Sequence, residues 1–212
     1  VREVRLPAPA QRIFSLAPSN TEILFAVGAG SQVVGRDLFS DYPAEAASVA
    51  DIGGSMGEYN LEAVVALQPD LVLAQAGGFN PPELIAALEG LGLTVFALPN
   101  PGTLEEMYAN LETVGALTGH AAEAAALVES LAARVAVVDA AIAAATDRPT
   151  VFYELDASDP ASPYTAGAGT FVDQLITRAG GTNVAGGIEN PWAQIDIETL
   201  LTYDPDLIIL GD

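Results

Sequence analysis

Serine and histidine are the residues of this sequence that most directly suggest catalysis. Gly53-Gly54-Ser55-Met56-Gly57 matches the Gly-x-Ser-x-Gly pattern of a nucleophile elbow, in which the serine sits on a sharp turn between a strand and a helix. An esterase also needs a histidine base, and His120 is the only histidine. The next predicted helix begins only at Asn60, and His120 opens a different, long helix. Short motifs of this kind often arise by chance, so a serine esterase using Ser55 is an alternative that we keep without favouring it.

Other familiar chemistries are not supported by the residue types present. Gly28-Ala29-Gly30 and Gly167-Ala168-Gly169 lack the third glycine of a dinucleotide-binding fingerprint and indicate turns or helix caps. A single histidine excludes a histidine-rich metal site, and the absence of cysteine excludes disulfides, thiolate catalysis and cysteine metal sites. We therefore expect no catalytic residue, no bound metal and no intrinsic cofactor.

The net charge of the chain limits the kinds of molecule that it can bind. The chain of 212 residues carries 28 acidic residues against 7 basic ones, all arginine, for a net charge of −21. Such a surface repels nucleic acid and anionic lipid, so we exclude both as partners. It also disfavours a strongly anionic ligand unless arginines gather near the site. Most of the acidity is accounted for by solubility.

The elements that must position any site occur in two related sets. Residues 60–74 and 196–210 share one pattern: an Asn or Asp, a short run with apolar residues at helical spacing, Pro-Asp, and a final apolar run. The first residue suits a helix N-cap, proline ends the helix, and the apolar run predicts a strand covered on both faces. A second match relates residues 19–35 to residues 170–186. The two halves of the chain are therefore predicted to be related lobes.

The order of the elements predicts an α/β fold of two Rossmann-like lobes with parallel sheets. We assign the N-terminal lobe to residues 1–118 and the C-terminal lobe to residues 148–212. Residues 119–147 contain an alanine-rich stretch without glycine or proline, which predicts one long connecting helix over residues 120–145. The second copy of the pattern reaches Asp212 at a point where the first half continues with helix, strand and helix, so we expect the second lobe to be incomplete.

The motifs in this order resemble the periplasmic binding proteins of cobalamin, ferric-siderophore and haem importers. The resemblance rests on five segments that span nearly the whole chain: RIFSLAPSNTEILFAVGAGSQVVG, SDYP, NLEAVVALQPDLVLA, PYTAGAGTF with AGGTNVAGG, and PWAQIDIETLLTYDPDLIIL. Ser40-Asp41-Tyr42-Pro43 and Pro191-Trp192 are most similar to the cobalamin-binding branch. The resemblance implies two lobes joined by a long helix, a ligand held in the cleft between them, and delivery of that ligand to a membrane ABC transporter.

Aromatic residues mark the predicted ligand site. In open α/β sheets, ligands bind beyond the carboxyl ends of the strands, here the predicted loops around residues 37–43, 75–81, 155–165 and 187–193. A corrin ring is large, flat and partly apolar, so aromatic side chains suit it. The residues in these loops that we expect to bind ligand are Tyr42, Trp192, Tyr164, Phe79, Gln75, Asp41 and Arg36, while Phe39 is a further aromatic there. Any of the rings could instead pack its own loop.

Three of these residues bear on the identity of the ligand. Gln75 stands where the resemblance implies tryptophan in many cobalamin binders, so one ring contact is missing. Arg36 is the only arginine near the predicted mouth of the first lobe, which keeps a ferric siderophore as the alternative ligand. Haem is a further alternative, with Tyr42 or Tyr59 as its axial ligand. A corrinoid carries little net charge and is compatible with the acidic chain.

The resemblance also implies one exposed glutamate on each lobe that pairs with arginines of the transporter. The matching positions are Glu83 and Glu198, and Glu62 competes because it is the repeat mate of Glu198. All three also suit the start of a helix, where acidic side chains are favourable anyway. We therefore expect a monomeric, extracytoplasmic receptor, periplasmic or lipid-anchored, that delivers cobalamin or a related corrinoid to an ABC importer.

Overall fold

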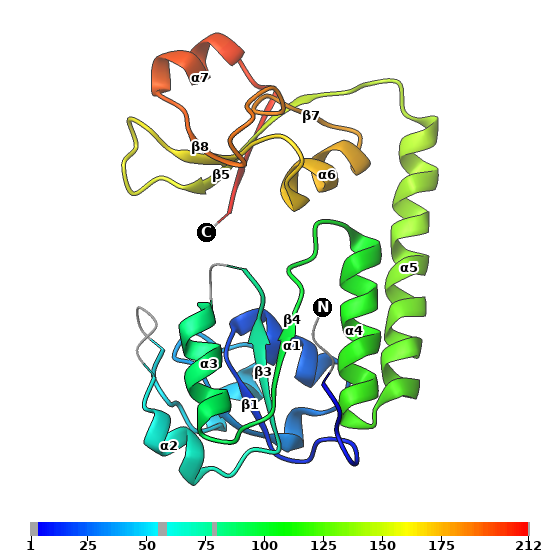
Figure 1. Ribbon diagram of the computed structural model, residues 1–212. Coiled ribbons are helices and arrows are strands. Elements are labelled where there is room, and N and C mark those ends of the chain that lie inside the picture. Colours follow the sequence, from blue (N-terminus) through cyan, green and yellow to red (C-terminus); the bar gives the residue numbers. More distant parts are fainter. Residues whose placement is uncertain (1–3, 55–58, 78–79, 212) are drawn as a thin grey trace. The chain divides into compact units, whose positions relative to one another are not determined.

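A computed structural model describes residues 4–54, 59–77 and 80–211 as two compact units, Val1–Ser130 and Leu131–Asp212 (Figure 1). The boundary between the units falls inside the long helix α5, Ala121–Ala144. That helix was predicted from its alanine-rich composition, and its existence is confirmed. Within the described residues, no helix is both long and apolar enough to cross a membrane.

The first unit is built on a four-stranded parallel sheet with the order β2-β1-β3-β4. Its strands are β1 (Ile13–Ser15), β2 (Val33–Arg36), β3 (Leu71–Gln75) and β4 (Val95–Leu98). Its helices are α1 (Pro18–Ala26), α2 (Leu61–Ala66), α3 (Pro82–Gly90) and α4 (Leu104–Thr118), with 3-10 turns η1 (Gly30–Gln32) and η2 (Ala44–Ser48). The predicted alternation of strands and helices is confirmed here.

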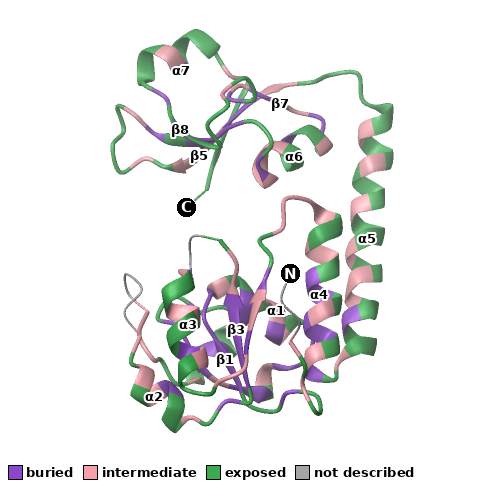
Figure 2. Cartoon of the chain, viewed as in Figure 1, coloured by how far each residue is buried: buried purple, intermediate pink, exposed green. Residues whose placement is uncertain are grey.

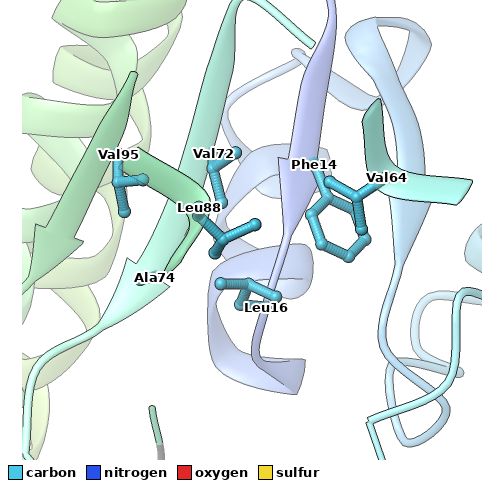
Figure 3. Packing of buried hydrophobic residues seen from close by; sticks show 7 residues of the cluster. All are labelled: Phe14, Leu16, Val64, Val72, Ala74, Leu88 and Val95. Atoms are coloured by element: carbon cyan, nitrogen blue, oxygen red, sulfur yellow. The ribbon is translucent and has the colours of Figure 1, made fainter. Parts of the chain in front are cut away.

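The core of this unit follows from alternation along the strands. Even-numbered residues of β1 and β3, with Leu16 just after β1, pack with one residue each from α2, α3 and β4. Figure 3 shows this cluster of Phe14, Leu16, Val72 and Ala74 with Val64, Leu88 and Val95. Ile13, Ser15, Leu71 and Leu73 on the other face of the same strands are buried as well, so both faces of the sheet are covered (Figure 2). This double burial is what near-continuous apolar strands of parallel sheets require.

The second unit has a mixed sheet. Its elements are β5 (Thr150–Asp156), β6 (Tyr164–Ala166), α6 (Phe171–Arg178), β7 (Thr182–Asn183), β8 (Trp192–Gln194), α7 (Ile197–Tyr203) and β9 (Leu207–Leu210). β7 and β9 pair with β5 in parallel, whereas β6 pairs antiparallel with β5 and β8. Sequence alone predicted only the parallel strands.

The internal repeat is confirmed by topology. In the first unit β1 lies between β2 and β3, and in the second β5 lies between β7 and β9, all in parallel. The helix caps repeat too, because the Asn60 side chain accepts from Ala63 N at 3.0 Å and the Asp196 side chain accepts from Thr199 N at 2.9 Å. The expectation that the second apolar run is covered on both faces is wrong, because all four side chains of β9 are exposed.

Candidate functional site

The carboxyl edge of the first sheet is where the predicted site residues of that unit gather. β1 to β4 run in parallel, so the segments that follow them meet at one edge of the sheet. Residues 37–43 follow β2, residues 76–81 follow β3, and residues 99–103 follow β4. Phe79, one of the predicted ligand residues, lies outside the described residues.

A series of hydrogen bonds between buried polar side chains holds the segment 37–43 in place. Asp37 accepts a hydrogen bond from Ser40 Oγ and a second one, at 2.9 Å, from the backbone N–H of Phe39. The series continues through Thr21 Oγ1, which lies 2.9 Å from Ser40 Oγ and 2.7 Å from Ser15 Oγ. All four side chains are at most 1 % exposed. Ser15 Oγ in turn donates to Ala17 O at 3.3 Å, which ties the series to the end of β1.

Arg36 takes part in the same support. Its side chain is 9 % exposed, and its guanidinium donates to the carbonyl oxygens of Ala46 at 2.9 Å and Asp37 at 3.0 Å. Buried charge of this kind is stabilised by such hydrogen bonds. The structure therefore shows Arg36 bonded to backbone oxygens of and near the segment 37–43. Its contact with a ligand stays a prediction.

The tip of the segment 37–43 presents side chains to solvent. Tyr42 is 65 % exposed, Phe39 is 54 % exposed and Asp41 is exposed as well. The peptide bond between Tyr42 and Pro43 is cis. Two aromatic rings thus project from a segment whose base is held by buried hydrogen bonds, which is a suitable arrangement for contact with a flat apolar ligand.

Tyr59 occupies a different environment from Tyr42. Its hydroxyl donates to Leu16 O at 3.3 Å, and its ring meets Phe14 edge to face with centroids 6.3 Å apart. Burial, followed by the nearby charge of Asp37, raises the pKa of Tyr59 to about 12. The hydroxyl is held by Leu16 O, and the use of Tyr59 as an axial ligand to haem stays a prediction.

Gln75 ends β3 and faces a residue that sequence reasoning missed. Its Nε2 donates to Asn100 Oδ1 at 3.2 Å, while its backbone N–H donates to Asn80 Oδ1 at 2.7 Å. Asn80 also donates to Leu16 O at 3.2 Å, which ties the ends of β1 and β3 together. The only signal for Asn100 in the sequence is its place just after a strand in a turn rich in proline and glycine.

Tyr164 and Trp192 lie on paired strands, so the prediction that both lie in loops is wrong. Tyr164 begins β6 and Trp192 begins β8, with Tyr164 opposite Gln194 and Ala166 opposite Trp192. Residues two apart on a strand share a face, so Tyr164 and Trp192 are diagonal neighbours on one face, typically about 7–8 Å apart. They are 42 % and 53 % exposed. The structure brings these two predicted residues together.

The turn before Trp192 rests on the glycine-rich segment 167–169. Gly167 N donates to Pro191 O at 3.0 Å and Ala168 N donates to Ile188 O at 3.1 Å. A Cβ on Gly167 would lie 2.2 Å from Asn190 O, so no other residue fits there without a shift of the backbone. This glycine segment is confirmed as a turn, and it sets the position from which β8 starts.

The three candidate docking glutamates occupy equivalent places. Glu62, Glu83 and Glu198 lie in the first turns of α2, α3 and α7, and all three are exposed. Their exposure meets the requirement of a docking residue, and their helix positions are also favourable for acids in general. Their proposed role stays a prediction.

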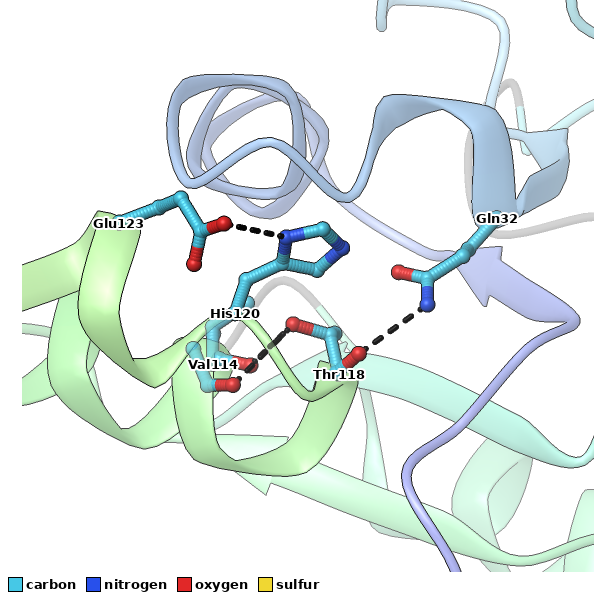
Figure 4. A network of polar contacts seen from close by, with 6 residues as sticks. Gln32, Val114, Thr118, His120 and Glu123 are labelled. Carbon is cyan, nitrogen blue, oxygen red and sulfur yellow. Dashed lines mark hydrogen bonds and ion pairs between the residues drawn. The ribbon is translucent and has the colours of Figure 1, made fainter.

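His120 lies in the turn between α4 and α5. Its Nδ1 lies 3.8 Å from Glu123 Oε1. The carbonyl oxygen of the nearby Thr118 accepts from Gln32 Nε2 at 3.0 Å, and Figure 4 shows both contacts. Ser55 lies outside the described residues. The described residues that flank it do not form a strand followed directly by a helix, because Gly53 and Tyr59 form an antiparallel bridge and α2 begins at Leu61. No group of three or more potential metal ligands occurs among the residues with described structure.

Comparison with known proteins agrees with this arrangement. Residues 13–212 match the model of a family described as periplasmic binding protein. The chain is 32 % identical over 212 residues to a cobalamin-binding protein of Halobacterium salinarum, covering 98 % of the chain but 56 % of that relative, or about half of its length. Among solved structures, the periplasmic vitamin B12 binding protein BtuF of Vibrio cholerae superposes with a TM-score of 0.81 at 30 % identity, covering 96 % and 77 % of the two chains. The periplasmic heme-binding protein RhuT from Roseiflexus sp. RS-1 superposes with a TM-score of 0.82 at 27 % identity, covering 95 % and 76 %.

Proposed function

The chain belongs to the periplasmic binding protein family, and on that premise we propose that it is part of an extracytoplasmic receptor that binds cobalamin or a related corrinoid for an ABC importer. Relatives of this family include proteins named for vitamin B12 and for heme, so the family alone does not choose between these ligands. The choice depends on the chemistry of the carboxyl edges of the two sheets.

The observation that carries the proposal is the absence of basic residues from the segments that follow the strands. The segments that follow the strands, residues 37–43, 76–81, 99–103, 157–163 and 184–191, contain no arginine, lysine or histidine, but they do contain acidic residues. Arg36, which ends β2, directs its guanidinium to backbone carbonyls. A ligand with several negative charges would meet uncompensated repulsion here.

Exposed aromatic rings complete the argument. Exposed apolar surface at the same edges comes from Tyr42 and Phe39 on the first unit and from Tyr164 and Trp192 on the second. A corrinoid has a broad ring with neutral amide groups at its rim, so its demands are apolar contact and hydrogen bonds. Haem carries two carboxylates and a ferric siderophore is often anionic, so both are less suited to these edges.

Calorimetric titration with cyanocobalamin tests this function. We expect one-to-one binding that is weakened about tenfold or more in Tyr42→Ala and in Trp192→Ala, because a buried aromatic contact is worth on the order of 1–3 kcal/mol. Leu91→Ala, which also removes an exposed apolar side chain, is the control and should bind as the unchanged protein does. Failure of the unchanged protein to bind would refute the corrinoid assignment. The same protein assayed with a chromogenic ester, beside Ser55→Ala, tests the esterase alternative.

We propose Glu83 and Glu198 as the residues that contact the transporter. Both are exposed in the first turn of a helix, so neutralising them should leave the fold and ligand affinity unchanged. In proteoliposomes that contain the importer, Glu83→Gln and Glu198→Gln should each reduce receptor-stimulated ATP hydrolysis, because each removes a charge partner of transporter arginines. Glu62→Gln is the matched control. A loss with Glu62→Gln and none with Glu198→Gln would reassign the contact to the repeat mate.

A further inference from the structure

The amide pair formed by Gln75 and Asn100 has a hydrogen-bonding pattern of its own. Gln75 is the last residue of β3 and Asn100 comes two residues after β4, which pairs with β3. Gln75 Nε2 donates to Asn100 Oδ1 at 3.2 Å. In the described parts of the chain neither side chain has another partner, so Gln75 Oε1 remains an acceptor and Asn100 Nδ2 remains a donor.

The backbone around this pair is fixed. The end of β3 is held by Asn80, which accepts from Gln75 N, and by the bond from Ala76 N to Leu98 O at 2.8 Å. The segment that carries Asn100 is held on one side by Asn110 Nδ2, which donates to Pro99 O at 2.8 Å, and on the other by Glu106 Oε2, which accepts from Gly102 N at 2.7 Å. The pair is therefore presented from two anchored segments, as a preorganised recognition site requires.

We propose that Gln75 and Asn100 together recognise a primary carboxamide on the rim of the ligand, and that they determine specificity for amide-bearing over carboxylate-bearing macrocycles. This inference rests on the proposed function and names the group that is read. A carboxamide donates its N–H to Gln75 Oε1 and accepts from Asn100 Nδ2, so the free acceptor of Gln75 and the donor of Asn100 are both satisfied.

A carboxylate in the same place is rejected for two physical reasons. It has no hydrogen to give to Gln75 Oε1, which would then face a negatively charged oxygen. It would also lie among segments without a basic residue, on a chain with a net charge of −21. Sites built to hydrogen-bond a particular group discriminate strongly against analogues that lack it, because their own polar groups are left unpaired.

The test compares cyanocobalamin with its three monocarboxylic acids, each of which has one peripheral propionamide hydrolysed. For the unchanged protein, at least one of the acids should bind about tenfold or more weakly than cyanocobalamin. In Asn100→Leu and Gln75→Leu, the affinity for cyanocobalamin should fall about tenfold and the preference for amide over that acid should disappear. Gln174→Leu, which removes an exposed amide on α6, is the control. It should keep both the affinity for cyanocobalamin and the preference for amide over acid.

The ratio of the two affinities separates recognition from a structural role. A variant that only loosens the fold weakens binding of amide and acid alike and leaves the ratio unchanged, and thermal unfolding shows that loosening directly. An unchanged ratio in both leucine variants overturns the inference while the corrinoid assignment stands. If the unchanged protein binds none of the corrinoids, the proposed function fails and the inference fails with it.

Discussion

At the scale of single residues, Gly167 is a position where the surrounding backbone leaves no room for a side chain. The backbone oxygens of Asn190 and Ile188 would lie 2.2 and 2.8 Å from a Cβ at this position. We expect Gly167→Ala to lower the free energy of unfolding by about 1–3 kcal/mol, because the turn must move to make room. It should also change the fluorescence of Trp192, the only tryptophan, because Pro191 O accepts from Gly167 N.

Gly187→Ala supplies the control, because no atom lies within 4 Å of a Cβ built there. Equal unfolding free energies for the two variants, with unchanged tryptophan fluorescence, would contradict the packing that we describe around Gly167.

Thr21 is the residue on which the support of the segment 37–43 depends. Its hydroxyl lies within hydrogen-bond distance of both Ser15 and Ser40, and its side chain is fully buried. Thr21→Val keeps the shape but leaves two buried hydroxyls without this partner, so we expect a loss of about 1–3 kcal/mol in the free energy of unfolding. Chymotrypsin should then cleave after Phe39 faster.

Thr113→Val removes an exposed threonine hydroxyl that bonds only within α4. It should change the free energy of unfolding by no more than about 0.5 kcal/mol, and it should leave the rate of chymotrypsin cleavage unchanged. If Thr21→Val behaves like Thr113→Val, the buried hydrogen bonds through Thr21 do not hold the segment 37–43.

At the scale of elements, the two Pro-Asp turns have a function that their sequence pattern does not reveal. Asp70 accepts from the backbone N–H groups of Gln11 at 2.8 Å and Arg12 at 3.0 Å, just before β1. Asp206 accepts from Thr150 N at 2.8 Å and from Thr150 Oγ1 at 2.9 Å, at the first residue of β5. In each unit the aspartate joins the start of the central strand to the strand that follows the turn.

The hydrogen bonds between Asp206 and Thr150 should make the stability of the second unit sensitive to acid. The hydrogen bonds from Thr150 hold the pKa of Asp206 below its ordinary value. A lowered pKa means that the carboxylate stabilises the folded state above about pH 4 and that this contribution is lost as the pH falls through the lowered pKa. Asp206→Ala should therefore be destabilised at pH 7, and its deficit relative to the unchanged protein should shrink toward pH 3 in denaturant titrations. A deficit that is the same at both pH values would show that the charge is not involved.

Much of the first unit could be predicted from the sequence, and less of the second. The strand of residues 71–75 and the helix before it follow from a proline, a cap residue and an apolar run. β6 and β8 are three residues long and follow prolines, so their local pattern is that of a loop, and only their mutual pairing makes them strands. Exposure of β9 likewise depends on what packs against it and not on its own apolar residues.

The residues of the candidate site also differ in how far the sequence alone predicts them. Tyr42, Tyr164 and Trp192 were predicted as site residues because rings near strand ends are visible in the sequence, whereas the place of Asn100 depends on a contact between residues 25 positions apart. Arg36 was expected at the mouth of the site. The sequence does not show that the carbonyl oxygens of residues 37 and 46 surround its guanidinium.

At the scale of the whole molecule, we propose that charge determines the choice of ligand. With 28 acidic residues against 7 basic ones, and no basic residue in the segments after the strands, the chain offers apolar and amide contacts but no counter-charge. Periplasmic binding proteins similar to this chain are named for vitamin B12 and for heme, and the two ligands differ most at their rims, in amides against carboxylates. On this proposal, the charge of the chain distinguishes between ligands that proteins of the same fold are named for.

The most direct measurement offers both ligands at once. Limiting protein is mixed with equal concentrations of cyanocobalamin and haemin, free ligand is removed by gel filtration, and the absorption spectrum of the protein fraction is recorded. We predict a corrinoid spectrum at about one equivalent per chain, with little haem, because haem carboxylates meet no basic residue in the segments that follow the strands. A haem spectrum without corrinoid would contradict the assignment of a neutral, amide-bearing ligand.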